Sequence, residues 1–524
     1  MRTAVVIVCF AAVLAGAVRC WGISGKRTVG EAAAISYLCA AGNQTQWKEI
    51  KRGAPPFARW VEAREWKGLL RTERPFIFRT ISRSLSSHDI HPPLYFWLLN
   101  VWAWLWGTGL WTGTSLNILV AMATTLLVFG LARTVLGDPF EASVVAFLWA
   151  LSPIVVRVSF QARQYDLLAL CTVAFVWQAV RYADASRRLR WWDHALLAAS
   201  AAAGALTHYH FALVIASAVV YVFARLVRSD RRRLVAALCC IAGGSLLFAV
   251  LHPGFVESFR HIKRHNTAWS LEQFNFRLEK TARALAAFFV LGRKALAILT
   301  ALLAALAVCA AVAWRRSGRT LRAYLQGVEW CGAAVLWFFG SIAGVVILLY
   351  LMAKSPKHAM GAKYLAAAWP FLAFVPVFLL RPCGPRARKA LAIAWCGAML
   401  LFGAMHAYYS VEALRGGPDR ITHIRAARRI VIDHVHRSNL PQIIWHIPDD
   451  TLIYAASQKH MLEHPAEWLE SLDGRCMFIG SLKYGNREDA RAQLLGLLRE
   501  EHEVTRVKGG VFGIGDIFLL EDAP

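Results

Sequence analysis

The sequence predicts a polytopic α-helical membrane protein with about eleven transmembrane helices, and three observations lead to this class. Of its 524 residues, 57% are hydrophobic, and the mean hydropathy of +0.42 is far above that of a soluble chain of this length. Several apolar runs reach the ~20 residues that a helix needs to cross a bilayer. Arginine-rich clusters recur between these runs, at residues 181–190, 225–233, 315–322 and 381–389.

The arginine clusters also predict the topology, because short cationic loops stay on the cytoplasmic side. Residues 3–18 are expected to be an uncleaved first helix, since Arg19 spoils the small-residue pattern of a cleavage site. The N-terminus is then cytoplasmic, and residues 21–114 form a long external loop. The ten further spans are expected at 115–136, 140–157, 166–182, 192–207, 209–226, 234–252, 295–314, 329–352, 363–380 and 389–407.

Residues 93–107 are apolar, but the charge pattern argues against a span there. Counting spans back from the cytoplasmic cluster at 187–190 places both ends of this stretch outside. We therefore predict a juxtamembrane helix in the first external loop. Its tryptophans suit the headgroup boundary, and they are Trp97, Trp102, Trp104 and Trp106.

Residues 408–524 are more charged and predict a small α/β domain outside the membrane. Helices are expected at 419–437 and 485–502, and strands at 442–446, 476–480 and 515–520. Alternating helices and strands are typical of an α/β fold. The sequence thus predicts two domains, a transmembrane domain over 1–407 and an extracytoplasmic domain over 408–524.

The net charge of +26 does not indicate a nucleic-acid-binding protein, because much of the arginine lies in loops where the topology requires it. The spans themselves are nearly free of charged residues. Ion-coupled transporters tend to place ionisable groups at mid-membrane, so this pattern disfavours transport.

Polar residues gather instead at the outer ends of the predicted spans, where they can converge on one cavity. A carboxylate there can act as general base on a hydroxyl, and Arg or Lys can hold a phosphate. Two further external loops, 253–281 and 353–363, add histidines and lysines. The main candidates are Glu31, His88, Asp89, His91, Arg163, Gln164, Tyr165, Asp166, His208, Tyr209, His210, Lys363 and Tyr364.

A metal site is left open by this pattern. His88, Asp89 and His91 can hold a divalent ion, although a hydrated loop cluster explains the same residues. No CxxC pair occurs among the eleven cysteines, which disfavours structural zinc. The sequence therefore requires no cofactor, and a divalent metal stays an alternative.

The motif His91-Pro92-Pro93-Leu94-Tyr95, followed by a Trp-rich helix ending at Leu105-Trp106-Gly107, resembles the end of the first external loop in membrane glycosyltransferases of the GT-C superfamily. The members resembled are protein O-mannosyltransferases, lipid A aminoarabinose transferases and rhizobial galacturonosyltransferases, of the family 39 and 83 types. Residues 159–168, 205–209 and 363–365 also match the pattern. The similarity in layout covers residues 1–407.

This resemblance implies an inverting glycosyltransferase of a multi-pass plasma membrane, such as the bacterial inner membrane. The enzyme would move a hexose or pentose from a polyprenyl-phosphate donor to a hydroxyl of an envelope glycan such as lipopolysaccharide, a lipid or a protein. In the family an Asp-Glu pair follows the first span. Here Gly30 stands at the Asp position, and only Glu31 remains.

The resemblance further implies roles for the candidate residues. Glu31 is expected to be the catalytic base, with Asp89 and Asp166 as supporting carboxylates. The residues expected to bind the donor phosphate or the substrate are His91, Arg163, Tyr165, His208, Tyr209, Lys363 and Tyr364.

Two other functions stay open from the sequence. One is an oligosaccharide ligase, which would use a polyprenyl-diphosphate donor with a longer glycan. The other is a non-enzyme, either a transporter, which the charge-free spans disfavour, or a non-catalytic scaffold, which the missing Asp at position 30 keeps open.

Overall fold

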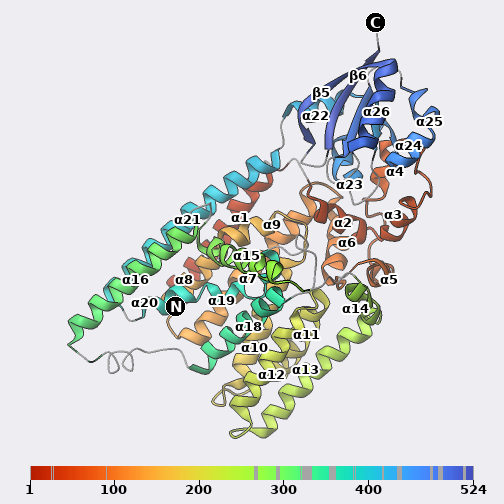
Figure 1. Ribbon diagram of the computed structural model, residues 1–524. Helices are drawn as coiled ribbons and strands as arrows, with labels where there is room; N and C mark the ends of the chain where they lie inside the picture. The colour runs from red at the N-terminus through yellow and green to blue at the C-terminus, as the bar shows by residue number, and fades with distance from the viewer. Residues whose placement is uncertain are drawn as a thin grey trace. The chain divides into compact units, whose positions relative to one another are not determined.

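The computed structural model describes most of the chain, and Figure 1 draws it from the N-terminus in red to the C-terminus in blue. Parts of the external loops predicted at 253–281 and 353–363, including His265 and His358, lie outside the described residues, as do residues 319, 321 and 322 of the cluster at 315–322. The described residues are 2–24, 26, 29–89, 91–264, 269–290, 295–318, 320, 333–352, 362–381, 383, 385–415, 418–433, 439–472, 476–481, 488–511 and 515–522.

The chain forms two compact units, each assembled from separate stretches of sequence. Unit 1 comprises residues 1–23, 85–95 and 115–410, and unit 2 comprises 24–84, 96–114 and 411–524. The sequence analysis divides the chain once, after residue 407. The structure instead groups most of the external loop at 21–114 with the C-terminal residues.

Unit 1 is helical, and each of the eleven predicted spans contains helix. Its main elements are α1 (Arg2–Ser24), α7 (Thr112–Leu136), α8 (Pro139–Ala150), α9 (Pro153–Ser159), α10 (Tyr165–Ala183), α11 (Trp191–Thr207), α12 (Phe211–Leu226), α13 (Arg231–Leu251), α14 (Phe255–Arg264), α15 (Leu271–Phe289), α16 (Ala295–Ser317), α18 (Ala333–Met352), η1 (Ala362–Leu365), α19 (Trp369–Leu372), α20 (Val375–Leu380) and α21 (Pro385–Arg415).

The structure supports a multi-pass membrane protein but not the count of eleven spans. Within the described ranges, six helices are long and apolar enough to cross a membrane, and a seventh arises if α8 and α9 form one span. Those two helices are bent by 50° at Leu151 and Ser152, where Pro153 cannot donate a backbone hydrogen bond. The predicted span 363–380 is also broken, into η1, α19 and α20.

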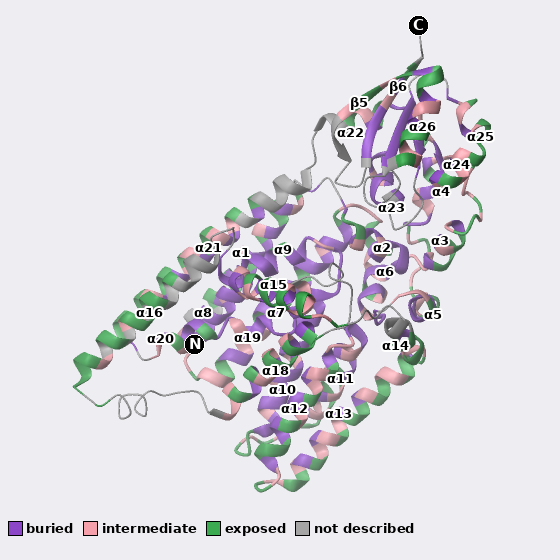
Figure 2. Cartoon of the chain, in the orientation of Figure 1, coloured by how far each residue is buried: buried purple, intermediate pink, exposed green. Residues whose placement is uncertain are grey.

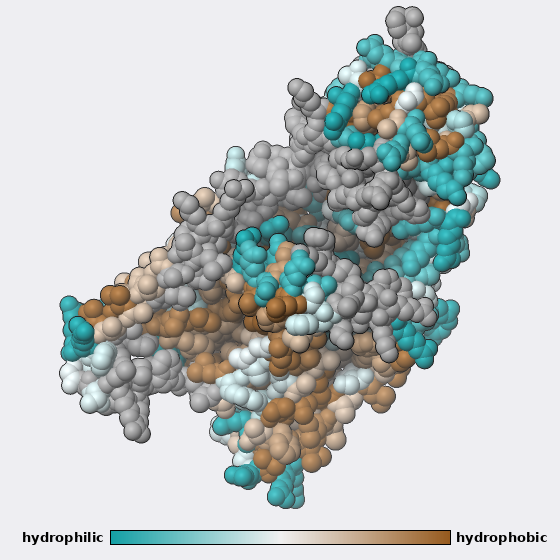
Figure 3. Space-filling view, viewed as in Figure 1, coloured by the Kyte–Doolittle hydropathy of each residue, from teal (hydrophilic) through white to brown (hydrophobic). Residues whose placement is uncertain are grey.

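The helices of unit 1 expose apolar side chains on their surface, as expected of helices that face lipid. The outward face of α13 exposes Val235, Leu246 and Val250, each by more than half of its surface. Figure 3 shows apolar residues in brown over this part of unit 1. The opposite face of α13 packs closely on α11, because Gly244 lets the helix approach the backbone of Ala198. Small residues at such contacts are typical of membrane helix packing.

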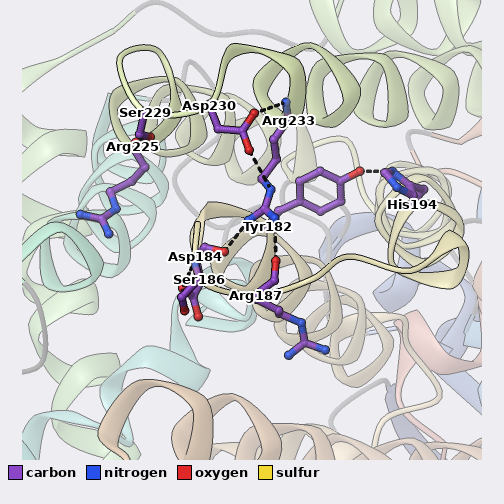
Figure 4. Close-up of polar contacts among 9 residues, drawn as sticks. All are labelled: Tyr182, Asp184, Ser186, Arg187, His194, Arg225, Ser229, Asp230 and Arg233. Atoms are coloured by element: carbon purple, nitrogen blue, oxygen red, sulfur yellow. Dashed lines mark hydrogen bonds and ion pairs between the residues drawn. The ribbon is translucent and has the colours of Figure 1, made fainter.

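Two neighbouring loops of unit 1 carry cations that the sequence analysis expects on the cytoplasmic side. Arg233 at the start of α13 donates to the carbonyls of Asp184 and Arg187, in the loop that follows α10. Figure 4 shows this junction, with Asp230 beside Arg233 and Tyr182 pointing to His194. The loops 184–190 and 227–230 therefore lie side by side, as expected of loops on one side of a membrane.

A buried ion pair ties α8 to the segment that precedes and begins α21. The Glu141 carboxylate lies 2.8 Å from Arg381 and 3.2 Å from Arg388, and Glu141 is 4% exposed. We expect Glu141→Gln to lower the free energy of unfolding by about 3 kcal/mol, because the buried guanidinium of Arg381 loses its anion. Thermal unfolding of the purified protein measures this loss. The matched control is Glu279→Gln, which breaks an exposed pair with Arg283 and should cost less than about 1 kcal/mol.

Unit 2 is built around a six-stranded sheet in the order β1-β3-β2-β4-β6-β5. Strands β3, β2 and β4 run parallel, while β1, β6 and β5 pair antiparallel. The central strands β2, β3, β4 and β6 are largely buried (Figure 2), whereas β1 is half-buried and β5 is mostly exposed. The strands are β1 (Trp60–Glu62), β2 (Arg429–Ile432), β3 (Leu452–Ala455), β4 (Cys476–Ser481), β5 (His502–Val511) and β6 (Gly515–Asp522).

The helices of unit 2 come from two parts of the chain, residues 31–106 and residues 418–501. The sheet core contains Val431, Tyr454, Trp468, Phe478 and Leu498. The helical elements of the unit are α2 (Glu31–Ala40), α3 (Gln44–Ile50), α4 (Ala63–Gly68), α5 (Phe78–His88), α6 (Leu94–Trp106), α22 (Pro418–Ala426), α23 (Asn439–Ile443), η3 (Ile444–His446), α24 (Gln458–Glu463), α25 (Ala466–Leu469) and α26 (Glu488–Glu501).

The predicted elements of the C-terminal region are partly right. The strands at 476–480 and 515–520 and the helix at 485–502 match β4, β6 and α26. The predicted strand 442–446 is wrong, because α23 and η3 occupy it after Pro441. The predicted helix 419–437 ends at Ala426, and β2 follows. Strand β1 comes from the external loop, a pairing that the sequence does not reveal.

The helix predicted at 93–107 is present as α6, while its place at the membrane surface stays a prediction. It has 13 residues, so its length of about 20 Å falls short of the ~30 Å hydrocarbon core. Among its tryptophans, Trp104 and Trp106 are about half exposed, and Trp97 donates to the carbonyl of Phe78.

Candidate functional site

His91 is the centre of the candidate site. It lies between α5 and α6, and Pro92 and Pro93 follow it, so the chain is stiff where α6 begins at Leu94. The imidazole is 5% exposed. Its Nε2 atom lies 2.6 Å from Nη2 of Arg163, and its Nδ1 atom lies 3.0 Å from the side-chain amide of Gln164.

These two contacts determine the tautomer of His91. A guanidinium can only donate, so Nε2 must accept from Arg163 and the ring proton must be on Nδ1. The Nδ1–H group must then donate to an acceptor, and on the Gln164 amide the acceptor is the oxygen. As the side chain is oriented here, its nitrogen faces His91, and its oxygen is buried without a hydrogen-bond partner. Rotating the amide by 180° satisfies both groups.

The segment that carries Arg163 is held by Asn117 of α7. The Asn117 side chain, which is completely buried, donates to the carbonyls of Ser159, Gln161 and Arg163. This turn joins α9 to α10, and it presents Arg163 and Gln164 to His91 from one side. Asn117 is thus a positioning residue that the sequence analysis did not identify, since its signal is a single amide in an apolar helix.

A cluster of histidine and tyrosine rings contacts His91 through His208. The ring of His208 lies 6.0 Å from His91 and 6.2 Å from Tyr165. Tyr364 of η1 lies 5.9 Å from Tyr165 and 6.1 Å from His208. The His210 ring lies 4.5 Å from the His208 ring and is tilted against it. The structure therefore brings together four of the residues expected to bind the ligand, and His210, another sequence candidate, joins them.

Two cationic side chains converge on this cluster. The Lys363 ammonium lies 5.5 Å from the centre of the Tyr165 ring, and both Lys363 and Arg163 act electrostatically on His91. Arg163 is 5% exposed. A pair of cations at a mostly buried aromatic site favours an anionic ligand.

The imidazoles of the cluster are neutral. Burial lowers the pKa of His91 well below its usual range, and the neighbouring cations of Arg163 and Lys363 lower it further. Burial lowers the pKa of His208 in the same way. Burial also lowers the pKa of His210 to about 4. Neutral rings can donate and accept at once, so these imidazoles can contact hydroxyl groups as well as an anion.

These pKa shifts predict acid sensitivity. A histidine whose pKa is lower in the folded state binds its proton more readily when unfolded, so stability is full above the unfolded pKa of about 6.5 and falls below it. For His210 the loss approaches about 3 kcal/mol near pH 4. We expect thermal unfolding to show a plateau above pH 6.5 and a decline below it. His210→Gln should make that decline shallower, and an unchanged slope would contradict this assignment.

Asp89 and Tyr209 lie on another side of His91. The Asp89 carboxylate is 3.9 Å from Nε2 of His91, and it acts electrostatically on Tyr209. Tyr209 shares a 2.9 Å hydrogen bond with His252 and packs on Phe259 at 4.8 Å. Burial raises the pKa of Tyr209 to about 12, so its phenol stays protonated. His252 is a second residue that the sequence analysis missed.

Asp166 lies in a different environment from the His91 cluster. It is 1% exposed, and it interacts with Arg19 of α1 and with Ser159. Arg19 is itself completely buried and donates to Ser159 and to the carbonyls of Ala15 and Ala150. The carboxylate thus balances a buried guanidinium that ties α1 to α8 and α9.

Glu31 is the first residue of α2 in unit 2, and it is exposed. Gly30 is the N-cap of this helix, so the carboxylate lies in its first turn. A Cβ added at Gly30 would meet nothing within 4 Å. The aspartate expected at that position would therefore fit the local structure, and its absence is not caused by lack of space.

The described part of the chain contains no group of three or more His, Cys, Asp or Glu side chains that could hold a metal ion. His91 already uses both ring nitrogens, toward Arg163 and Gln164. His88, Asp89 and His91 therefore do not form a ligand set in this arrangement.

Comparisons with known proteins find similarity to one family model and to one solved fold. Residues 90–253, which include most of the cluster, match the family model of dolichyl-phosphate-mannose-protein mannosyltransferase. The fold is similar to ArnT from Cupriavidus metallidurans bound to undecaprenyl phosphate, with a TM-score of 0.54 and 13% identity over 98% of this chain and 97% of that chain. The apo form of the same protein matches with a TM-score of 0.52, at the same identity and coverage.

A search of curated proteins finds no match. The resemblance to the GT-C superfamily that the HPPL motif indicated is confirmed, because the motif region matches a family of this type and the whole chain shares the fold.

Proposed function

We propose that this chain, whose fold is that of the GT-C membrane glycosyltransferases, transfers a sugar from a polyprenyl-phosphate donor to an acceptor hydroxyl on the outer face of the membrane. The observation that carries the proposal is the convergence of Arg163 and Lys363 on the buried imidazole of His91. A phosphate is the anion that two such cations and a neutral histidine recognise best. The similar ArnT structure is a complex with undecaprenyl phosphate, which supports the same donor class here.

Each residue of the cluster has a role in this proposal. Arg163 holds the donor phosphate with its fork of N–H groups, and Lys363 adds a mobile positive charge. The neutral rings of His91 and His208 position the phosphate and the sugar. Tyr165, Tyr209 and Tyr364 line the site and offer hydroxyls and ring faces to the sugar.

The reaction is a single displacement. The acceptor hydroxyl gives its proton to a carboxylate, for which we propose Glu31, and its oxygen attacks the anomeric carbon of the sugar. The bond between that carbon and the phosphate oxygen breaks, and the lipid phosphate leaves with the electron pair. Arg163 and Lys363 stabilise the charge that grows on the leaving oxygen. One displacement inverts the anomeric configuration.

Asp89 and Asp166 have supporting roles. Asp89 lies beside His91 and Tyr209, where it can accept from a sugar hydroxyl. Asp166 balances Arg19 and so keeps the turn at 159–164 in place. Neither role needs a metal.

The proposed orientation follows the charge pattern. The arginines of the loops 184–190 and 227–230 lie at the opposite ends of α10 and α11 from Tyr165 and His208. With the cations in the cytoplasm, the His91 cluster and residues 408–524 would be external. The acceptor would then be an envelope glycan, lipid or protein.

The test is sugar transfer by the full-length protein in lipid. Radiolabelled polyprenyl-phosphate sugars are offered one at a time, beside a polyprenyl-diphosphate oligosaccharide, with a crude envelope fraction as acceptor. We expect transfer from a monophosphate donor. The Lys363→Gln variant should have a higher KM for that donor than the wild type. Transfer from the diphosphate donor alone would show a ligase. Transport of the donor across the membrane without transfer would show a transporter, and no turnover with any donor would favour a scaffold.

A further inference from the structure

Phe76 has an unusual backbone for an aromatic residue. Its φ angle is +60°, in the left-handed region that bulky side chains rarely adopt. Asn100 of α6, which is completely buried, holds the turn in this conformation. The Asn100 side chain accepts from the Phe76 N–H at 2.9 Å and donates to the carbonyls of Arg74 and Ala40. The strained turn is therefore enforced by the fold.

This turn displays the Phe76 ring outward. The residue is 62% exposed, while the neighbouring Phe78 is partly buried and packs on Trp97 at 5.2 Å. A strained backbone that exposes a large apolar ring costs stability twice, once for the strain and once for the exposure. Such a feature points to an apolar partner outside the described chain.

A second loop of unit 2 shares this surface. The N–H of Thr72 donates to Thr108 at 3.2 Å, so the loops 71–77 and 107–111 lie side by side. The second loop and the end of α6 expose four more large apolar side chains, and they are Trp104, Leu105, Trp106 and Trp111. We call Phe76 and these four residues the aromatic surface.

Spanning helices do not explain the aromatic surface. None of the six candidate spans among the described helices contains these residues, and the nearest in sequence, α7, begins at Thr112, directly after them. This part of the chain also carries a net positive charge, because residues 70–84 contain four arginines and one glutamate. Arg74 and Arg79, which flank Phe76, are exposed. Aromatic rings beside arginines are typical of a surface that enters the headgroup layer of an anionic membrane.

We propose that Phe76 is a membrane anchor of unit 2, which inserts into a bilayer while Arg74 and Arg79 bind the phosphates of anionic lipids. This role is separate from sugar transfer and does not depend on it. It explains why the fold maintains a strained phenylalanine where glycine would be relaxed.

The anchor is tested by photo-crosslinking of the full-length protein in bilayer discs. Benzoylphenylalanine, an aromatic of similar shape, replaces Phe76, and the same residue at Lys459 is the control, since that side chain is 84% exposed on α24. We expect lipid adducts at position 76 and few at 459 by mass spectrometry. Equal lipid adducts at both positions, or a protein adduct at 76, would overturn the proposal.

Lipid charge and stability give two further readouts. Adding phosphatidylglycerol to phosphatidylcholine discs should raise the adduct yield at 76. Arg74→Gln or Arg79→Gln should each lower that preference by roughly fivefold, whereas Arg499→Gln, an exposed arginine of α26, should not. Phe76→Gly should keep or raise the thermal midpoint in detergent, because glycine relaxes the turn. A lower midpoint would show that Phe76 serves the fold itself.

Discussion

Replacing Glu31 with Gln should reduce sugar transfer by about 10²- to 10⁴-fold while leaving donor binding intact, because the variant loses only the group that takes the acceptor proton. Glutamine has the same shape, and Glu31 is exposed in the first turn of α2, so folding should be unaffected. The measurement is kcat for transfer from the active polyprenyl-phosphate sugar, beside the donor Kd.

Glu65 offers a matched control for this variant. It is also an exposed carboxylate in the first turn of a unit 2 helix, α4, and Glu65→Gln should transfer at the wild-type rate. If Glu31→Gln retains full activity, the base is another carboxylate, and Asp89→Asn becomes the decisive variant, since Asp89 lies beside His91. Full activity of both variants would contradict a carboxylate base at either position.

Replacing Arg163 with Gln should lower kcat/KM for the donor by roughly 10²- to 10³-fold, because the leaving phosphate loses its principal positive partner in a mostly buried site. Arg163 is 5% exposed and donates to His91. Arg163→Lys should recover only part of the activity, since an ammonium keeps the charge but lacks the fork of N–H groups.

Arg157→Gln is the control for Arg163. Arg157 is an exposed arginine of α9, one turn and a half earlier on the same segment, and its loss should leave the donor kinetics unchanged. A parallel measurement of donor Kd separates binding from chemistry. If Arg163→Gln kept normal donor affinity and normal kcat, the proposed phosphate site would have to lie elsewhere.

The departure at Gly30 makes the Glu31 experiment the more informative of the two. The family resemblance implies an Asp-Glu pair, and this chain retains only the second member. Because an added Cβ at Gly30 would meet no neighbour, Gly30→Asp is a structurally permitted variant. An increase in transfer by this variant would show that the missing carboxylate limits the reaction.

The sequence by itself determined that the protein is a helical membrane protein, where its cationic loops lie and where the HPPL motif lies. Hydropathy and charge act over a few residues, so α7, α10 and α13 could be read from local composition, and so could the short helix α6. His91, Arg163, His208 and Lys363 were recognisable as candidates because each lies at the end of an apolar run.

Tertiary structure alone decided which of these candidates meet. The start of α10 and η1 lie close together, and this brings Arg163, Gln164 and Lys363 near His91. These residues are separated from His91 by 72 residues or more in the sequence. Asp166, one turn from Arg163 in sequence, turns instead to Arg19 and so has a structural partner. Strand β1 joins the C-terminal sheet from the external loop in the same way. Such long-range pairings depend on packing and burial across the whole fold, which no local pattern encodes.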